Sequence, residues 1–373
     1  YQTVHHDIWD YDVPAQPVLV DVTRDGEKVP SVAVPTKMGD IFLLDRRDGT
    51  PVHPIEERPA PQNPEAGEYL SPSQPFSPLP NFHPYRYEKD MWGMTPLDQM
   101  VCRIEYRMMR YEGMYTPPTV PGGLKTGTLL YPGNFGGFNW GSVSVDADNG
   151  LLVAAPMMLA HRLMLVTPEQ VAEAGPKGAL LLGKNHPAVR MDPDAPPHKV
   201  DPDDPYDHSQ IRFFGIPMPF MSILGTQVPC FEPPWSRIAV MDLNTKELLW
   251  SRPAGSMKGS GPFNLRLNLP LEVGTAIRAG TLTTRGGLAF LSSTMDSTVR
   301  TGEEKWASSL PGNGQSTPMS YRSEKTGKQH LIVTVPNPTW RYPRDPVNND
   351  YVDSQSVRDG KGGYVISYAL DDG

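Results

Sequence analysis

The sequence predicts a loop-rich, all-β protein, and three observations support this fold class. Proline and glycine contribute 42 and 34 of the 373 residues, a density that long helices and central strands do not tolerate. The 7 Trp, 15 Tyr and 11 Phe are core-forming side chains, which disordered chains largely lack. Short apolar runs of strand length also recur between turn residues along the chain.

Nine apolar runs have the length and composition of β-strands. Glycine, asparagine or aspartate lies between many of them, as expected where a chain reverses in a tight turn. The predicted strands are residues 17–22, 29–34, 40–45, 141–146, 151–155, 238–242, 287–291, 330–335 and 364–370.

A strand–turn–strand pattern repeats along the chain and predicts how the strands are arranged. Residues 239–250 combine a strand, a polar turn and a second strand that ends in Trp250, and residues 301–306 repeat the second half. Residues 44–50 and 145–150 repeat the turn without the tryptophan. Such a recurring unit is typical of a β-propeller, whose blades are four-stranded sheets. The alternative is that these stretches are ordinary hairpin turns.

A Pro-rich region with one helix separates the first strands from the later ones. Thr95 suits an N-cap, Pro96 the first helical position and Asp98 the acidic position of a capping box. Gly113 can end the helix, and we expect the whole region to be an insertion over one face of the propeller. The apolar residues at helical spacing are Leu97, Met100, Val101, Ile104 and Met108.

Charge and composition exclude some functions and leave others open. The formal net charge of 34 − 42 = −8 argues against a nucleic-acid-binding protein, which normally carries a basic face. No run reaches the roughly 18 consecutive apolar residues of a membrane span. The chain opens at Tyr1 without a signal pattern, so we expect that a leader has been removed or that the chain is a fragment. Cys102 and Cys230 form either one disulfide or two buried thiols.

The densest polar cluster lies at the start of the chain. His5 and His6 are adjacent, so on an extended chain they point to opposite faces and do not easily bind one metal ion. A single ligand or a structural histidine is the simpler interpretation. Asp7, Asp10 and Asp12 offer carboxylates suited to a general base or to a hard cation.

Several longer runs resemble, in order, the membrane-bound dehydrogenases of the glucose/quinate/shikimate family, which depend on pyrroloquinoline quinone (PQQ). The resemblance covers nearly all of this chain but only about the C-terminal half of a family member. The matching runs are residues 5–17 (HHDIWDYDVPAQP), 35–39, 44–47, 56–59, 73–77, 90–93, 110–113, 131–134 and 368–370.

The resemblance implies an eight-bladed propeller that holds PQQ near its axis together with Ca²⁺ or Mg²⁺. Only the C-terminal blades belong to this chain, so the rest of the propeller is needed to close the ring. Residues 1–52 would form the blade segment with the catalytic aspartate, residues 53–131 the Pro-rich insertion, and residues 132–373 the remaining blades. Near Arg300 the chain is shorter than the family pattern.

The family pattern also implies roles for three residues. Asp10 matches the catalytic aspartate, which would take the proton of the substrate hydroxyl while hydride passes to PQQ; it is also a possible metal ligand. Lys37 matches the lysine that hydrogen-bonds the quinone oxygens and stabilises negative charge there. Asp296 matches an acidic residue near the cofactor. Without the resemblance, Lys37 is a lysine at a strand end and Asp296 a turn residue.

Departures from the family pattern bear on the substrate. Ala155 stands where glucose-oxidising members usually have asparagine, and Asn337 and Pro338 fall where they have a Gly-Gly-His run. Loss of polar contacts in a buried pocket leaves sugar hydroxyls without partners. We therefore expect a cyclic polyhydroxy acid, quinate or shikimate, as substrate. Glucose or polyol oxidation by the same chemistry is the alternative, and a non-catalytic propeller scaffold is another.

The resemblance further implies a place in the cell and an electron acceptor. Family members are attached to the inner membrane by an N-terminal segment, face the periplasm and pass electrons to ubiquinone. We expect the same here, with the membrane segment outside the given sequence.

Overall fold

The computed structural model describes most of the chain, with gaps chiefly in its second half. The described residues are 1–65, 68–167, 170, 213–224, 228–256, 271–274, 279–292, 295–298, 301–308, 310, 314, 316–335 and 363–369.

The described residues form twenty β-strands, one 3₁₀ helix and one α-helix, which confirms the mostly β fold class. Each of the nine predicted strands is present. The strands are β1 Val18–Arg24, β2 Glu27–Pro35, β3 Ile41–Asp45, β4 Glu56–Pro59, β5 Ser73–Phe76, β6 Met109–Arg110, β7 Gly127–Leu130, β8 Ser144–Asp146, β9 Leu151–Ala154, β10 His161–Val166, β11 Phe214–Pro219, β12 Arg237–Asp242, β13 Glu247–Pro253, β14 Thr281–Thr283, β15 Leu288–Leu291, β16 Met295–Thr298, β17 Glu304–Trp306, β18 Met319–Arg322, β19 Gln329–Val335 and β20 Tyr364–Ala369, with helices η1 Glu88–Asp90 and α1 Pro96–Met108.

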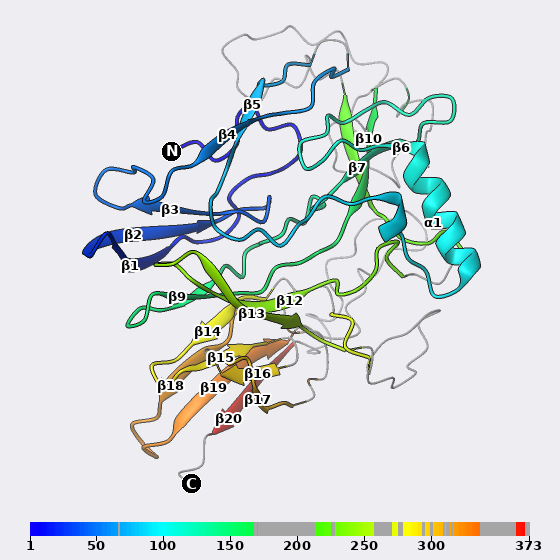
Figure 1. Ribbon diagram of the computed structural model, residues 1–373. Coiled ribbons are helices and arrows are strands. Elements are labelled where there is room, and N and C mark those ends of the chain that lie inside the picture. Colours follow the sequence, from blue (N-terminus) through cyan, green and yellow to red (C-terminus); the bar gives the residue numbers. More distant parts are fainter. Residues whose placement is uncertain are drawn as a thin grey trace, which may run out of the picture.

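The strands pair into separate small sheets. Five of them have three or four strands, in the orders β1-β2-β3, β11-β10-β7-β6, β13-β12-β9-β8, β14-β15-β16-β17 and β18-β19-β20, and β4-β5 is a separate hairpin. Nearly all neighbours are antiparallel; β6 and β7 are the parallel pair among the described strands. In Figure 1 the blue sheet β1–β3 lies above the green strands β9, β12 and β13, and the yellow and orange strands β14–β19 and the red β20 follow below them.

Burial along the central strands shows why the sheets stack. In β9, Leu152 packs into the apolar cluster shared with β1–β3, whereas its neighbour Val153 packs into the cluster shared with β15. Successive side chains of a strand point to opposite faces. A strand whose two faces are both apolar must therefore lie between two other sheets. This face-to-face stacking is the arrangement expected of propeller blades.

The Pro-rich region is joined to the rest of the molecule by a shared sheet. Strands β6 and β7 come from this region, yet β7 pairs with β10, with Leu130 opposite His161. The boundary expected at residue 131 therefore falls between two strands of one sheet.

The predicted helix begins as expected and ends early. The Thr95 side chain accepts a hydrogen bond from the Asp98 backbone N–H, so the N-cap is confirmed. The helix ends at Met108 rather than near Gly113 because Met109 and Arg110 pair with β7. Among the described helices, none is long and apolar enough to cross a membrane.

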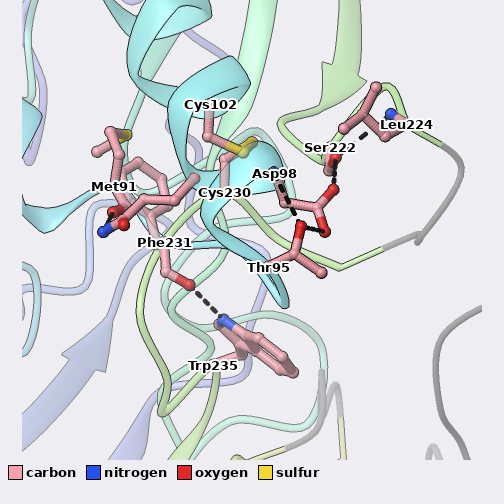
Figure 2. The surroundings of a disulfide bond; sticks show 10 residues. Met91, Thr95, Asp98, Cys102, Ser222, Leu224, Cys230, Phe231 and Trp235 are labelled. Carbon is pink, nitrogen blue, oxygen red and sulfur yellow. Dashed lines mark hydrogen bonds between the residues drawn. A yellow bond between two sulfur atoms is a disulfide. The ribbon is translucent and has the colours of Figure 1, made fainter.

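The face of α1 that packs inward is not its apolar stripe. Leu97, Met100 and Ile104 are about half exposed, whereas Asp98 and Cys102 are buried. Figure 2 shows the reason: Cys102 forms a disulfide with Cys230, and Asp98 accepts a hydrogen bond from the Ser222 hydroxyl.

The disulfide settles the question that the two cysteines left open. Cys102 and Cys230 are fully buried, and their Cα atoms lie 5.4 Å apart although 128 residues separate them in sequence. Beside them the Trp235 indole N–H donates to the Phe231 carbonyl at 3.0 Å (Figure 2). The bridge thus fastens α1 to the chain that follows β11, and closing so long a loop restricts the unfolded chain strongly.

A buried polar cluster supports the turn between β2 and β3. The Asp40 carboxylate accepts a hydrogen bond from the Asn81 side-chain amide at 2.6 Å, and the Asn81 carbonyl oxygen accepts from the His83 backbone N–H at 2.7 Å. Burial raises the pKa of Asp40 to about 6, although the Asn81 hydrogen bond opposes the shift. Burial lowers the pKa of His83 to about 4, so His83 is neutral at pH 7.

The Asp40 carboxyl makes folding depend on pH. Because its pKa rises from 3.8 to about 6 on folding, the folded state holds the proton more tightly, and stability falls as pH rises from about 4 to about 6. The Asp40 carboxyl alone lowers the free energy of unfolding by about 3 kcal/mol over this pH range. We expect Asp40→Asn to remove this fall. Urea denaturation of both proteins at pH 4 and pH 7 gives the free energy of unfolding at each pH. If the mutant and the wild type differ in this free energy by the same amount at both pH values, the assignment to Asp40 is wrong.

Candidate active site

The Asp7 side chain shapes the loop that carries the predicted catalytic aspartate. One carboxylate oxygen of Asp7 accepts the Trp9 backbone N–H at 2.9 Å, and the other accepts the Tyr11 N–H at 2.7 Å. Burial raises the pKa of Asp7, and these two hydrogen bonds partly offset that rise. The Asp7 carboxylate therefore holds the backbone N–H groups of both residues that flank Asp10 in the sequence.

Two aromatic anchors fix the same loop. The Trp9 indole N–H donates to the Thr116 carbonyl at 2.7 Å, and the Tyr11 hydroxyl donates to the Pro132 carbonyl at 2.8 Å. Both rings are buried. Asp10, between them, is left exposed and has a φ of +68°, a left-handed conformation that is uncommon outside glycine and is often found at functional sites.

Lys37 meets Asp10 although they lie 27 residues apart in sequence. Its ammonium Nζ is 2.8 Å from Asp10 Oδ2 and 2.7 Å from Asp12 Oδ1. The lysine side chain is only 12% exposed. Burial works against the charged form, but the hydrogen bonds that Lys37 donates to the two aspartates raise its pKa overall. Lys37 is therefore a protonated, partly desolvated cation in a fixed position.

The backbone around Lys37 is held by glycines of the chain after β7. Gly136, at φ +76°, packs so closely on Lys37 that a Cβ atom there would lie 2.5 Å from the lysine Cγ. The Gly137 N–H donates to the Lys37 carbonyl at 2.7 Å. Gly39 similarly lies against the His83 ring, where a Cβ would come within 2.2 Å of Nδ1. A side chain at these positions would displace the lysine or its turn.

A cavity of about 360 Å³ opens beside Asp10. Its walls are largely apolar, and Asn134 and Glu68 join Asp10 as its polar lining residues. The Asn134 Oδ1 atom is buried, and within the described part of the chain no group hydrogen-bonds to it. The sequence analysis identified neither residue as part of the site. Asn134 lies in one of the runs that match the family, but no role was assigned to it. Glu68 lies in the Pro-rich insertion, where no motif or regular spacing marks a functional residue.

Ala155, one of the other predicted site residues, does not line this cavity. It is 6% exposed and packs in an apolar cluster between sheets. Asp296 lies on β16, with its backbone opposite Phe290 and Trp306. Asn337 and Pro338 lie outside the described residues. Their roles in the site stay predictions.

The Lys37 ammonium is the feature of the site that suits PQQ, a polyanionic quinone, although Asp10 and Asp12 share its charge. Lys37 supplies a fixed cation with ammonium donors, and the unsatisfied Asn134 oxygen is available to a donor of a bound group. The described residues contain no cluster of three or more His, Cys, Asp or Glu side chains placed to hold a metal ion. The role of Asp10 as a metal ligand stays a prediction.

The chain is similar in sequence to known dehydrogenases. The quinoprotein glucose dehydrogenase of Escherichia coli is 36% identical over 100% of this chain and 42% of its own length. The quinate/shikimate dehydrogenase (quinone) of Acinetobacter baylyi is 35% identical over 94% and 41%. The glycerol dehydrogenase large subunit of Gluconobacter oxydans is 37% identical over 89% and 44%. The chain thus spans about two fifths of the length of these relatives.

Residues 1–331 match the family model described as the β-propeller domain of glucose/ethanol/alcohol dehydrogenases that use PQQ. The match confirms the predicted propeller architecture, of which this chain holds a part. The stacked sheets and the meeting of Asp10 with Lys37 are consistent with it. The chain therefore belongs to the PQQ-dependent glucose/ethanol/alcohol dehydrogenase β-propeller family.

Proposed function

We propose that the protein is a PQQ-dependent dehydrogenase that oxidises a hydroxyl group of a small polyhydroxy compound. The observation that supports this most directly is the Asp10–Lys37 pair, 2.8 Å apart at the edge of the cavity. A scaffold would not need an aspartate held in a left-handed conformation next to a desolvated lysine, because both cost stability.

The chemistry divides between two side chains. Asp10, paired with the Lys37 ammonium, accepts the proton of the substrate hydroxyl as a general base. Lys37 would hold the cofactor oxygens through its ammonium donors, and its positive charge would oppose negative charge on them. Bound PQQ supplies the acceptor for the hydride of the carbinol carbon. The substrate thereby loses one proton and one hydride and becomes a carbonyl compound.

The predicted pocket residues do not decide between a cyclic polyhydroxy acid and an uncharged polyol as substrate. The preference for quinate or shikimate rested on Ala155, Asn337 and Pro338, and Ala155 does not line the cavity. Relatives named for glucose, quinate/shikimate and glycerol are similarly distant, at 35–37% identity. We therefore keep the coarser class here, with the cyclic acid and the uncharged polyol as the two candidates.

We further propose the setting that the family implies. Ca²⁺ or Mg²⁺ would accompany the cofactor, the rest of the propeller would close the ring, and ubiquinone would receive the electrons. The protein would work at the periplasmic face of the inner membrane, attached by a segment outside the given sequence. Reduction of a ubiquinone analogue by the whole protein in vesicles, with substrate supplied outside, tests this arrangement.

Asp10→Asn tests the general base. The asparagine has nearly the same shape but cannot accept a proton, so kcat should fall by about 10²- to 10⁴-fold, while PQQ still binds. The assay is dye reduction by the whole protein, reconstituted with PQQ and Ca²⁺ or Mg²⁺, on quinate, shikimate, glucose and glycerol. Asp21→Asn, which removes an exposed carboxylate bonded to Arg46, is the control. Normal turnover by Asp10→Asn would refute the assignment.

Asp7→Asn tests whether Asp7 positions Asp10. An asparagine has one acceptor oxygen in place of two, so either the Trp9 or the Tyr11 N–H loses its partner and the loop relaxes. A small displacement of a catalytic group costs about 10- to 100-fold in rate, so kcat should fall while KM and PQQ affinity change little. The control is Asp25→Asn, at an exposed turn residue. If Asp7→Asn lowers the melting temperature but leaves kcat unchanged, Asp7 only stabilises the fold.

A further inference from the structure

The cavity beside Asp10 has an unusual balance of charge. Two carboxylates, Asp10 and Glu68, line it, together with the neutral Asn134. Among the described residues that form its walls there is no lysine, arginine or histidine. The nearby Lys37 ammonium is bonded to Asp10 and Asp12 and is not part of the lining.

The Glu68 carboxylate is available for a ligand, unlike that of its neighbour Glu65. Glu65 Oε1 accepts the Val120 backbone N–H at 2.9 Å, so Glu65 has a structural partner. The Glu68 backbone N–H donates to the Glu65 carbonyl at 3.0 Å. Within the described part of the chain, no hydrogen bond or ion pair engages the Glu68 side chain.

This arrangement distinguishes the two candidate substrate classes. An uncharged polyol can place one hydroxyl at Asp10 and donate a second hydroxyl to Glu68, while its C–H faces lie on apolar walls such as Leu163 and Leu165. Hydrogen bonds to a charged acceptor are stronger than neutral ones. A polyhydroxy acid would instead bring a third carboxylate next to two others, where like charges repel and no wall residue compensates.

We propose that Glu68 is a specificity-determining residue that selects an uncharged polyol and rejects polyhydroxy acids such as quinate. The inference rests on the proposed function, because it concerns the substrate of the same site. It assigns a role to the Pro-rich insertion, which delivers Glu68 to a cavity whose catalytic aspartate comes from the start of the chain.

Glu68→Gln tests the proposal in the whole protein loaded with PQQ and Ca²⁺ or Mg²⁺. The loss of one charged hydrogen bond should raise KM for glucose and glycerol about 10- to 100-fold, with a smaller change in kcat. KM for quinate should fall, because one repelling charge is gone. Glu65→Gln keeps an acceptor for Val120 and removes the same charge three residues away, so it is the matched control and should change neither constant.

The outcomes separate this inference from the proposed function. Wild-type turnover of quinate in preference to glucose and glycerol, or an unchanged selectivity in Glu68→Gln, would overturn the role of Glu68 and leave PQQ-dependent oxidation intact. Absence of PQQ-dependent turnover on any alcohol would overturn the proposed function itself. In that case, ligand-induced shifts of the melting temperature still decide the role of Glu68: glycerol or glucose should stabilise the wild type more than Glu68→Gln, and quinate should not.

Discussion

The site depends on the need to neutralise a partly buried lysine. A charged ammonium removed from water is costly unless carboxylates or other acceptors surround it. Lys37 satisfies this need with Asp10 and Asp12, so the start of the chain and the β2–β3 turn must come together. Once they do, the loop between the two aspartates has little freedom, and Asp10 is presented at the edge of the cavity.

The surrounding packing makes this pairing rigid. Trp9 and Tyr11 lie in an apolar cluster that also contains Leu130 of β7 and Leu163 of β10. The first sheet is thereby joined to the sheet that the Pro-rich region shares. The disulfide between α1 and Cys230 fastens the same region a second time. The insertion thus forms part of the wall of the cavity, which explains how Glu68 comes to line it.

The sequence predicted the local structure well because short-range chemistry governs it. The nine strands follow from apolar runs bounded by turn residues, and the helix start follows from Thr95 and Pro96. The helix end was wrong because pairing of Met109 with β7 is a tertiary effect. The inward face of α1 was unpredictable for the same reason: a disulfide and the bond from Ser222 to Asp98 fix it. The pairing of Cys102 with Cys230 likewise needs the fold.

The site was predictable only where residues matched a known pattern. Asp10 and Lys37 were identified in this way, and the structure brings them together. Glu68 and Asn134 became visible only once the fold placed distant segments around one cavity. Ala155 packs in an apolar cluster between sheets and does not line this cavity, and its role in the substrate pocket stays a prediction.

The most direct test of the central claim, that Lys37 holds the cofactor, is a PQQ titration of the whole protein followed by quenching of its tryptophan fluorescence. Loss of a charged hydrogen bond in Lys37→Gln should raise the Kd for PQQ by about tenfold or more. Lys37→Arg, which keeps the positive charge, should bind closer to the wild type. An unchanged Kd in a folded Lys37→Gln protein would contradict the claim and separate the Asp10–Lys37 pair from the cofactor.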